Sequence, residues 1–192
     1  MDHFEYITMV VSFVTAFAVS QVLAGWGRQF ALRESQPPYL LHTVSSILFL
    51  ITLVQSIWGS WIYRDVPWTF ATFLVYFSST LPLAGAAVLI HPPAASAEST
   101  SIRSHYFSSG RAAYLLVAIW IAITGWLEWL LTDHLGRYGE HTALVLAVRV
   151  LTGSVLTIQS ASRSPKVHWV GLTLLASIFL FFALRFAEFT TG

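Results

Sequence analysis

Arg149 and Glu128 are the residues of this sequence whose type and position best suit chemistry, because each is a charged side chain within a long apolar segment. Placing Arg at the centre of a membrane-spanning helix costs roughly 2.5 to 3.5 kcal/mol, so such a residue normally faces a partner, water or a ligand. Glu128 lies on the preceding apolar segment, which would run antiparallel to that of Arg149. We therefore predict an ion pair between them, with Gln55 or Glu5 as candidates to extend it.

An intramembrane pair of this kind suits a binding site or a pathway. Arg binds carboxylates and phosphates, and ionisable residues inside a membrane commonly mark the route of an ion or substrate. The leading prediction is a small channel, transporter or ligand-binding bundle with an outward-facing polar cavity around Arg149 and Glu128, taking an anionic small ligand or an ion. Arg185 and Glu188, just past the last apolar run, are candidates for the same site. The alternative is that the pair only fixes the register of two helices.

The composition indicates an integral membrane protein. Hydrophobic residues make up 56% of the chain and charged residues 10%, whereas a soluble domain has roughly 25% charged residues. The absence of cysteine excludes disulfides, thiolate metal sites and thiol catalysis. Ten basic against nine acidic residues give no electrostatic case for a nucleic-acid partner. An enzyme is the least favoured class, since no GxSxG motif and no glycine-rich phosphate loop occurs.

Six apolar segments are long enough to cross a hydrocarbon core of roughly 30 Å. They cover residues 6–25, 40–63, 68–90, 112–131, 142–160 and 167–184. The predicted fold class is therefore all-α: a polytopic transmembrane bundle of six helices forming one domain over residues 1–192, without a soluble domain. Pro82 predicts a kink in the third helix, since proline removes a backbone hydrogen bond there. Trp58, Trp61 and Tyr63 at the end of the second segment are typical of an interfacial aromatic belt.

The basic residues predict the orientation of the bundle. The first, third and fifth connections hold six of them: Arg28, Arg33, Arg103, Arg111, Arg163 and Lys166. The second and fourth hold only Arg64 and Arg137. The positive-inside rule then places the odd connections in the cytoplasm and both termini outside. Every charged candidate site residue falls in the outer half of the membrane.

Four histidines fall at the opposite end of the bundle: His42, His91, His105 and His168. Histidine suits a membrane interface because its ring is amphipathic, and no metal-ligand spacing such as HxxxH accompanies these residues. No cofactor is the leading expectation. The alternative is haem held by His42 and His168, which have compatible depth, or a quinone near the tryptophans, in an electron-transfer subunit.

A third alternative is an accessory subunit of a larger membrane complex, or a homo-oligomer. Small side chains recur every four residues along the first segment at Ser12, Ala16, Ser20 and Ala24. Such a face lets another helix approach closely, within one subunit or between two.

Short motifs in the first 114 residues carry a resemblance. They are Phe4-Glu5-Tyr6, Val22-Leu23-Ala24-Gly25, Val66-Pro67-Trp68-Thr69-Phe70 and His105-Tyr106-Phe107. On these motifs the chain resembles an uncharacterised family of small bacterial six-helix inner-membrane proteins. The resemblance implies a bacterial inner-membrane location and carries no activity over.

Overall fold

The computed structural model describes residues 3–96, 99–131 and 142–189, apart from the side chains of residues 3, 96, 142, 182 and 184–189. All regular structure among these residues is helical. The long helices are α1 (His3–Ala31), α2 (Leu40–Gly59), α3 (Phe70–Leu89), α5 (Arg111–Leu130), α7 (Thr142–Ala161) and α8 (Pro165–Phe189). Shorter elements are η1 (Ser60–Tyr63), which continues α2, then η2 (Ala94–Ser96) and α4 (Ile102–Phe107).

Five of the described helices are long and apolar enough to cross a membrane: α1, α2 with η1, α3, α5 and α7. The prediction of an all-α, multi-pass membrane protein is confirmed at this level. In α8 the apolar stretch among the described residues is Pro165–Phe181, which is shorter. The count of six spans therefore stays a prediction.

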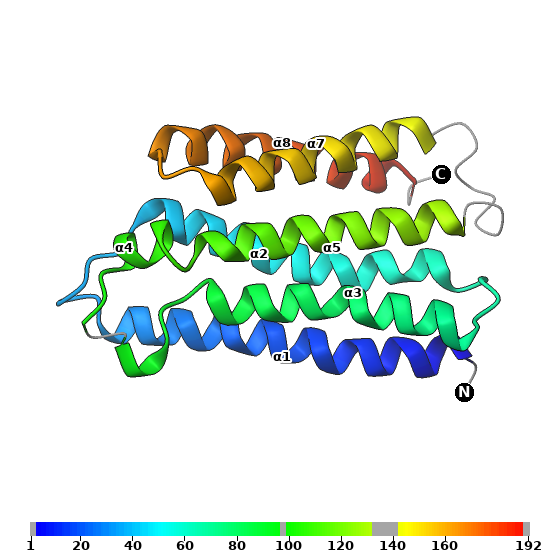
Figure 1. The fold of residues 1–192 in the computed structure, drawn as a ribbon, viewed down its shortest axis with the longest axis horizontal. Helices are drawn as coiled ribbons and strands as arrows, with labels where there is room; N and C mark the ends of the chain where they lie inside the picture. Colours follow the sequence, from blue (N-terminus) through cyan, green and yellow to red (C-terminus); the bar gives the residue numbers. More distant parts are fainter. Residues whose placement is uncertain (1–2, 97–98, 132–141, 190–192) are drawn as a thin grey trace.

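The long helices lie side by side along one axis, and α7 and α8 form a pair beside the other four (Figure 1). α3 packs on α1 and α5, and α5 packs in turn on α7, while α8 packs on α2 and α7. The start of α1 and the end of α8 lie at one end of the bundle, and α4 lies at the other (Figure 1). We call these the terminal end and the α4 end.

Local sequence explains where the elements begin and end. Thr69 caps the start of α3: its hydroxyl accepts from the backbone N–H of Thr72, and the Thr72 hydroxyl accepts from the N–H of Thr69. This capping box satisfies two backbone donors that the first turn leaves open. The helix continues through Pro82. α1 runs past Gly25, where the predicted segment stops, because Gly25 serves as a close packing position rather than as a helix end.

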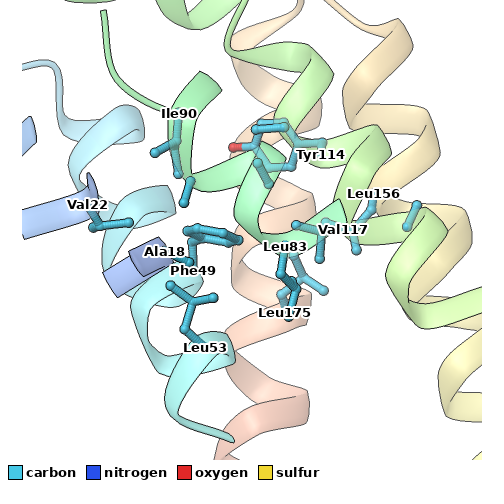
Figure 2. Packing of buried hydrophobic residues seen from close by; sticks show 14 of the residues in the cluster. Ala18, Val22, Phe49, Leu53, Leu83, Ile90, Tyr114, Val117, Leu156 and Leu175 are labelled. Carbon is cyan, nitrogen blue, oxygen red and sulfur yellow. The ribbon is translucent and has the colours of Figure 1, made fainter. Parts of the chain in front are cut away.

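The core lies between the long helices. Ala18, Val22, Phe49, Leu53, Leu83, Val117, Leu156 and Leu175 come from six different helices and point toward one another (Figure 2). The outer surface is apolar as well, with Phe13, Trp58 and Phe70 each at least 70% exposed. Apolar exposure on this scale would be unfavourable in water and is expected of helices that face lipid.

Candidate functional site

Arg149 on α7 and Glu128 on α5 form the predicted ion pair, in which Arg149 Nη2 donates to Glu128 Oε1. Arg149 Nη1 donates to Thr124 Oγ1 at 2.8 Å. Tyr63 Oη donates to Glu128 Oε1 at 3.2 Å. The side chains of Arg149 and Glu128 remain only 24% and 14% exposed. A charged side chain removed from water in this way needs both an opposite charge and hydrogen bonds, and the site supplies both.

Features of α5 and η1 position the pair. Thr124 and Glu128 are four residues apart on α5 and therefore share one helix face. Gly125 lies between them, and a Cβ atom at that position would sit 3.4 Å from Arg149 Cδ. The missing side chain lets the arginine stem lie along α5. Tyr63 reaches the carboxylate from η1, where it is buried.

The other predicted site residues are placed differently. Gln55 on α2 is exposed and lines the same cavity as the pair. Glu5 is exposed in the first turn of α1. Arg185 and Glu188 fall on α8, with side chains outside the described residues.

Neither Thr124 nor Tyr63 was predicted from the sequence to contact the ion pair. The four-residue spacing of Thr124 from Glu128 was an available signal. Tyr63 was assigned to the aromatic belt, and no spacing in the sequence connects it to Glu128.

A cavity of about 360 Å³ runs through the bundle from this pair toward the α4 end. Its lining comes mainly from α2, α3, α5, α7 and α8, with Val11 of α1 and residues of η1, and at the far end Tyr106 and Tyr114 take part. Most lining residues between the two ends are apolar, among them Leu83, Val117 and Leu175, which Figure 2 shows. The cavity thus has mainly apolar walls, with the ion pair at one end, the Tyr106 and Tyr114 hydroxyls at the other, and further hydroxyl groups between them.

The hydroxyl groups along the middle of the cavity are bonded to their own helices. Thr52 donates to the carbonyl of Leu48 at 2.9 Å, and Ser79 to that of Tyr76 at 2.6 Å. Thr80 donates to the carbonyl of its own preceding turn in the same way. These bonds use the hydroxyl protons, so the middle of the cavity presents few donors.

The α4 end of the cavity is closed by a buried hydrogen-bond network. His168 Nε2 lies 3.2 Å from the carbonyl oxygen of Ser162, so this nitrogen carries the proton and Nδ1 accepts from Tyr106 Oη at 2.9 Å. Ser45 donates to its own helix at 2.6 Å and accepts from Tyr114 Oη at 2.6 Å. Every donor in the network has an acceptor, and burial raises the pKa of Tyr106. The network therefore acts as a polar wall.

Two further histidines at this end, His42 and His105, satisfy the last carbonyls of α3. His42 Nε2 donates to the carbonyl of Ile90 at 2.8 Å, and His105 Nε2 to that of Leu89 at 2.9 Å. A helix end leaves such carbonyls without partners in its own backbone. Gln29 Nε2 lies 3.3 Å from His42 Nδ1 and 3.0 Å from His91 Nδ1, and donates to both. These rings have a structural role that the sequence does not reveal.

The predicted haem pair, His42 and His168, lies at one end of the bundle as expected. The Tyr106 ring contacts both, with centroids 6.2 Å from His42 and 5.0 Å from His168. Both nitrogens of each ring are already within hydrogen-bond distance of a partner. Axial ligation would require these bonds to break and Tyr106 to move, so the residues in this arrangement do not fit a haem.

Replacing Tyr63 by Phe is expected to lower the free energy of unfolding by about 1 to 2 kcal/mol, because a buried carboxylate loses a donor while the apolar ring stays. Chemical denaturation of the purified protein in mixed micelles measures this change. The same substitution at Tyr6, which is 50% exposed, is the control and should leave the stability unchanged. An unaltered midpoint in Tyr63→Phe would contradict the hydrogen bond to Glu128.

Stability is expected to fall as the pH is lowered from about 6.5 toward 3. Burial is the main reason that the pKa of His91 is lowered from 6.5 to about 3, and repulsion from positive charge on His42, Arg28 and His105 lowers it further. In this window the unfolded chain binds a proton that the folded chain does not, which favours unfolding by up to about 1.4 kcal/mol per pH unit. A pH series of denaturation midpoints should show a smaller slope for His91→Gln. Equal slopes would show that His91 is not held neutral.

Comparisons of this chain with protein-family models, with curated proteins and with solved structures each find no match. The function must therefore be argued from the geometry of the cavity and its charged pair.

Proposed function

We propose that this multi-pass membrane protein binds a small amphipathic molecule in its central cavity, with the molecule's polar group at Arg149 and Glu128. The observation that carries this proposal is the shape of the cavity: one continuous space, mainly apolar, with an ion pair at one end. Sites for small molecules typically have volumes of roughly 300 to 1,000 Å³, apolar walls and a few placed polar groups. The cavity meets each of these conditions.

Of the functions considered from the sequence, binding or transport of such a molecule fits better than ion conduction. An ion crossing the bundle needs water or polar groups along its whole path. Here the middle of the cavity is lined mainly by apolar side chains, and its hydroxyl protons are bonded to the backbone. A long apolar group needs no hydrogen-bond partners and can therefore occupy such a space.

The geometry also favours a binding role for Arg149 over a role in helix register alone. The guanidinium group has five N–H donors, of which two have acceptors among the described residues. Its side chain keeps 24% of its surface exposed and lines the cavity. Donors that face a cavity are available to the polar group of a ligand.

Binding of tritiated hexadecanol tests the proposal, because this probe joins one hydroxyl to one apolar chain. A scintillation proximity assay on the protein in lipid nanodiscs should show saturable binding. Val148 on α7 lines the cavity, and Val148→Phe should fill it and weaken binding at least tenfold. Leu151→Phe is the control, since Leu151 lies on the same helix, lines neither the cavity nor the hollow beside Arg149, and is 45% exposed. Absence of saturable binding to the unmodified protein would overturn the proposal.

The expected location is the bacterial inner membrane that the family resemblance implies, and the positive-inside pattern predicts both termini in the periplasm. Fusions to alkaline phosphatase, which is active only in the periplasm, test this orientation. Activity is expected for a fusion after Asp65 in the second connection and not for one after Ser35 in the first. The reverse pattern would overturn it.

A further inference from the structure

We infer that the occupant of the cavity is a single unbranched alkyl chain of about 13 to 18 carbons with one polar end, and that the cavity selects this length. This inference rests on the proposed function and gives it a ligand class. Three features of the cavity carry it: the closed wall at the α4 end, the distance from that wall to the guanidinium group of Arg149, and the small mean width of the space between them.

The wall at the α4 end stops a chain and yet accepts an apolar chain end. Its lining residues Ser45, Tyr106 and Tyr114 are buried. Tyr114 donates its hydroxyl proton to Ser45, and Tyr106 donates its own to His168. Ser45 in turn donates to its own helix. Because each hydroxyl proton is already bonded, a methyl group that rests against the wall leaves no donor without an acceptor.

The polar end of the cavity lies a defined distance from this wall. Arg149 donates to Thr124 and to Glu128. These two residues lie 10 and 14 positions beyond Tyr114 on α5, a helix that runs along the bundle axis (Figure 1). At about 1.5 Å per residue, the guanidinium group is therefore roughly 15 to 21 Å from the wall.

This distance sets the number of carbons. An extended peptide backbone advances about 3.3 to 3.6 Å for every three bonds, and an extended alkyl chain, built from similar bonds and angles, advances at nearly the same rate. A span of roughly 15 to 21 Å therefore corresponds to about 13 to 18 bonds. A longer chain with its polar group at Arg149 must fold back or push the lining apart, and both are unfavourable in a packed bundle. A much shorter chain forgoes contacts with the walls.

The mean width of the cavity allows one chain. Its lining on α2 extends from Ser45 to Gly59, which is roughly 21 Å. A volume of about 360 Å³ over that length gives a mean cross-section of roughly 17 Å². Carbon atoms in contact are roughly 3.5 to 4.0 Å apart, so one chain needs about 13 Å² and two chains side by side about 25 Å². Two-chain lipids and branched chains are therefore too wide.

Ala113 is the residue at which the selected length can be changed. It lies on α5 beside Tyr114, is buried and lines the cavity at the closed end. A phenyl ring in place of its methyl group would occupy the last part of the space and bring the wall closer to Arg149. Ala112, the preceding residue, is exposed and lies outside the cavity lining, which makes Ala112→Phe the matched control.

Competition against tritiated hexadecanol in nanodiscs tests the length and the width. Concentrations are expressed as mole fractions in the lipid, so that differences in water solubility do not enter. Unlabelled hexadecanol should displace the probe at a level at least tenfold lower than tetracosanol, which has 24 carbons, or phytanol, which has the same 16-carbon chain with four methyl branches. Equal displacement by either alcohol would overturn the inference, whereas failure of the probe itself to bind would overturn the proposed function.

The Ala113→Phe variant tests where the length is set, with tritiated dodecanol as the probe. This variant should bind dodecanol at least tenfold more tightly than hexadecanol, whereas Ala112→Phe and the unmodified protein should prefer hexadecanol. A preference for hexadecanol in Ala113→Phe would overturn the position of the wall. If this variant does not fold, the alcohol series on the unmodified protein decides the inference alone.

Discussion

Replacing Arg149 by Met is expected to lower the free energy of unfolding by about 3 to 5 kcal/mol, because Glu128 is left without its counter-charge in a site largely removed from water. The double variant Arg149→Met, Glu128→Leu should recover most of this loss, since both charges are then absent and apolar side chains take their place. Chemical denaturation in mixed micelles measures all three proteins. A double variant no more stable than the single one would show that the ion pair is not what holds α5 and α7 in place.

The same variants separate a structural role of the pair from a binding role. The double variant should fold with near-normal stability and yet bind tritiated hexadecanol at least tenfold more weakly, because the donors at the polar end of the cavity are gone. A purely structural pair predicts the opposite outcome, in which restored stability brings back normal binding.

Replacing Gly25 by Ala is expected to cost about 3 kcal/mol, because the added methyl group meets the ring of His91. A Cβ atom on Gly25 would lie 2.3 Å from both Cγ and Cδ2 of that ring. The ring cannot move freely, since Gln29 donates to it and the His42 ring packs against it with centroids 4.8 Å apart. Either α1 or the end of α3 must therefore shift.

Gly27→Ala provides the matched control for this substitution. Gly27 lies on the same helix, two residues on, and a Cβ atom there would have no neighbour within 4 Å. The variant should be as stable as the unmodified protein or more stable by up to about 1 kcal/mol, as expected for Ala in place of Gly in a helix. Equal losses in the two variants would contradict the packing of His91 against Gly25.

The ion pair could be predicted from the sequence because a charge within an apolar segment needs a partner, and few partners were available. Arg149 and Glu128 lie on consecutive segments toward the same end of the bundle, so antiparallel packing and the reach of the long arginine side chain are sufficient to bring them together. Tyr63 could not be predicted in the same way. Its contact with Glu128 depends on the 3₁₀ turn that ends α2 and on how α2 and α5 are rotated about their axes. Hydrophobic periodicity does not determine these rotations.

The sequence predicts the polar end of the cavity around Arg149 and Glu128 but not the apolar walls of its middle, for a related reason. Polar residues such as Thr52, which recur on one face of the second segment, suggest a polar interior when they are read as isolated side chains. In the folded helices their hydroxyl groups bond to backbone carbonyls of the preceding turn, which leaves mainly apolar groups to form the walls. Whether a hydroxyl bonds its own helix or faces a ligand depends on its side-chain rotamer, and the sequence does not reveal rotamers.

The histidines show how a structural role resembles a ligand-binding one in sequence. His42 and His105 hold the last carbonyls of α3, and a clue was present in Pro92 and Pro93, which stop that helix. The partners of these rings are far apart in the chain, and only the packing of α2 and α4 on the end of α3 connects them.

Photolabelling with a diazirine analogue of hexadecanol, followed by mapping of the labelled residues, tests the central claim most directly. We expect adducts on residues that line the cavity, such as Val117 on α5 and Leu175 on α8, and we expect excess hexadecanol to suppress them. Adducts confined to outward-facing residues such as Phe13 and Phe70, unaffected by competitor, would show only contact with the bilayer. That result would contradict a ligand site within the bundle.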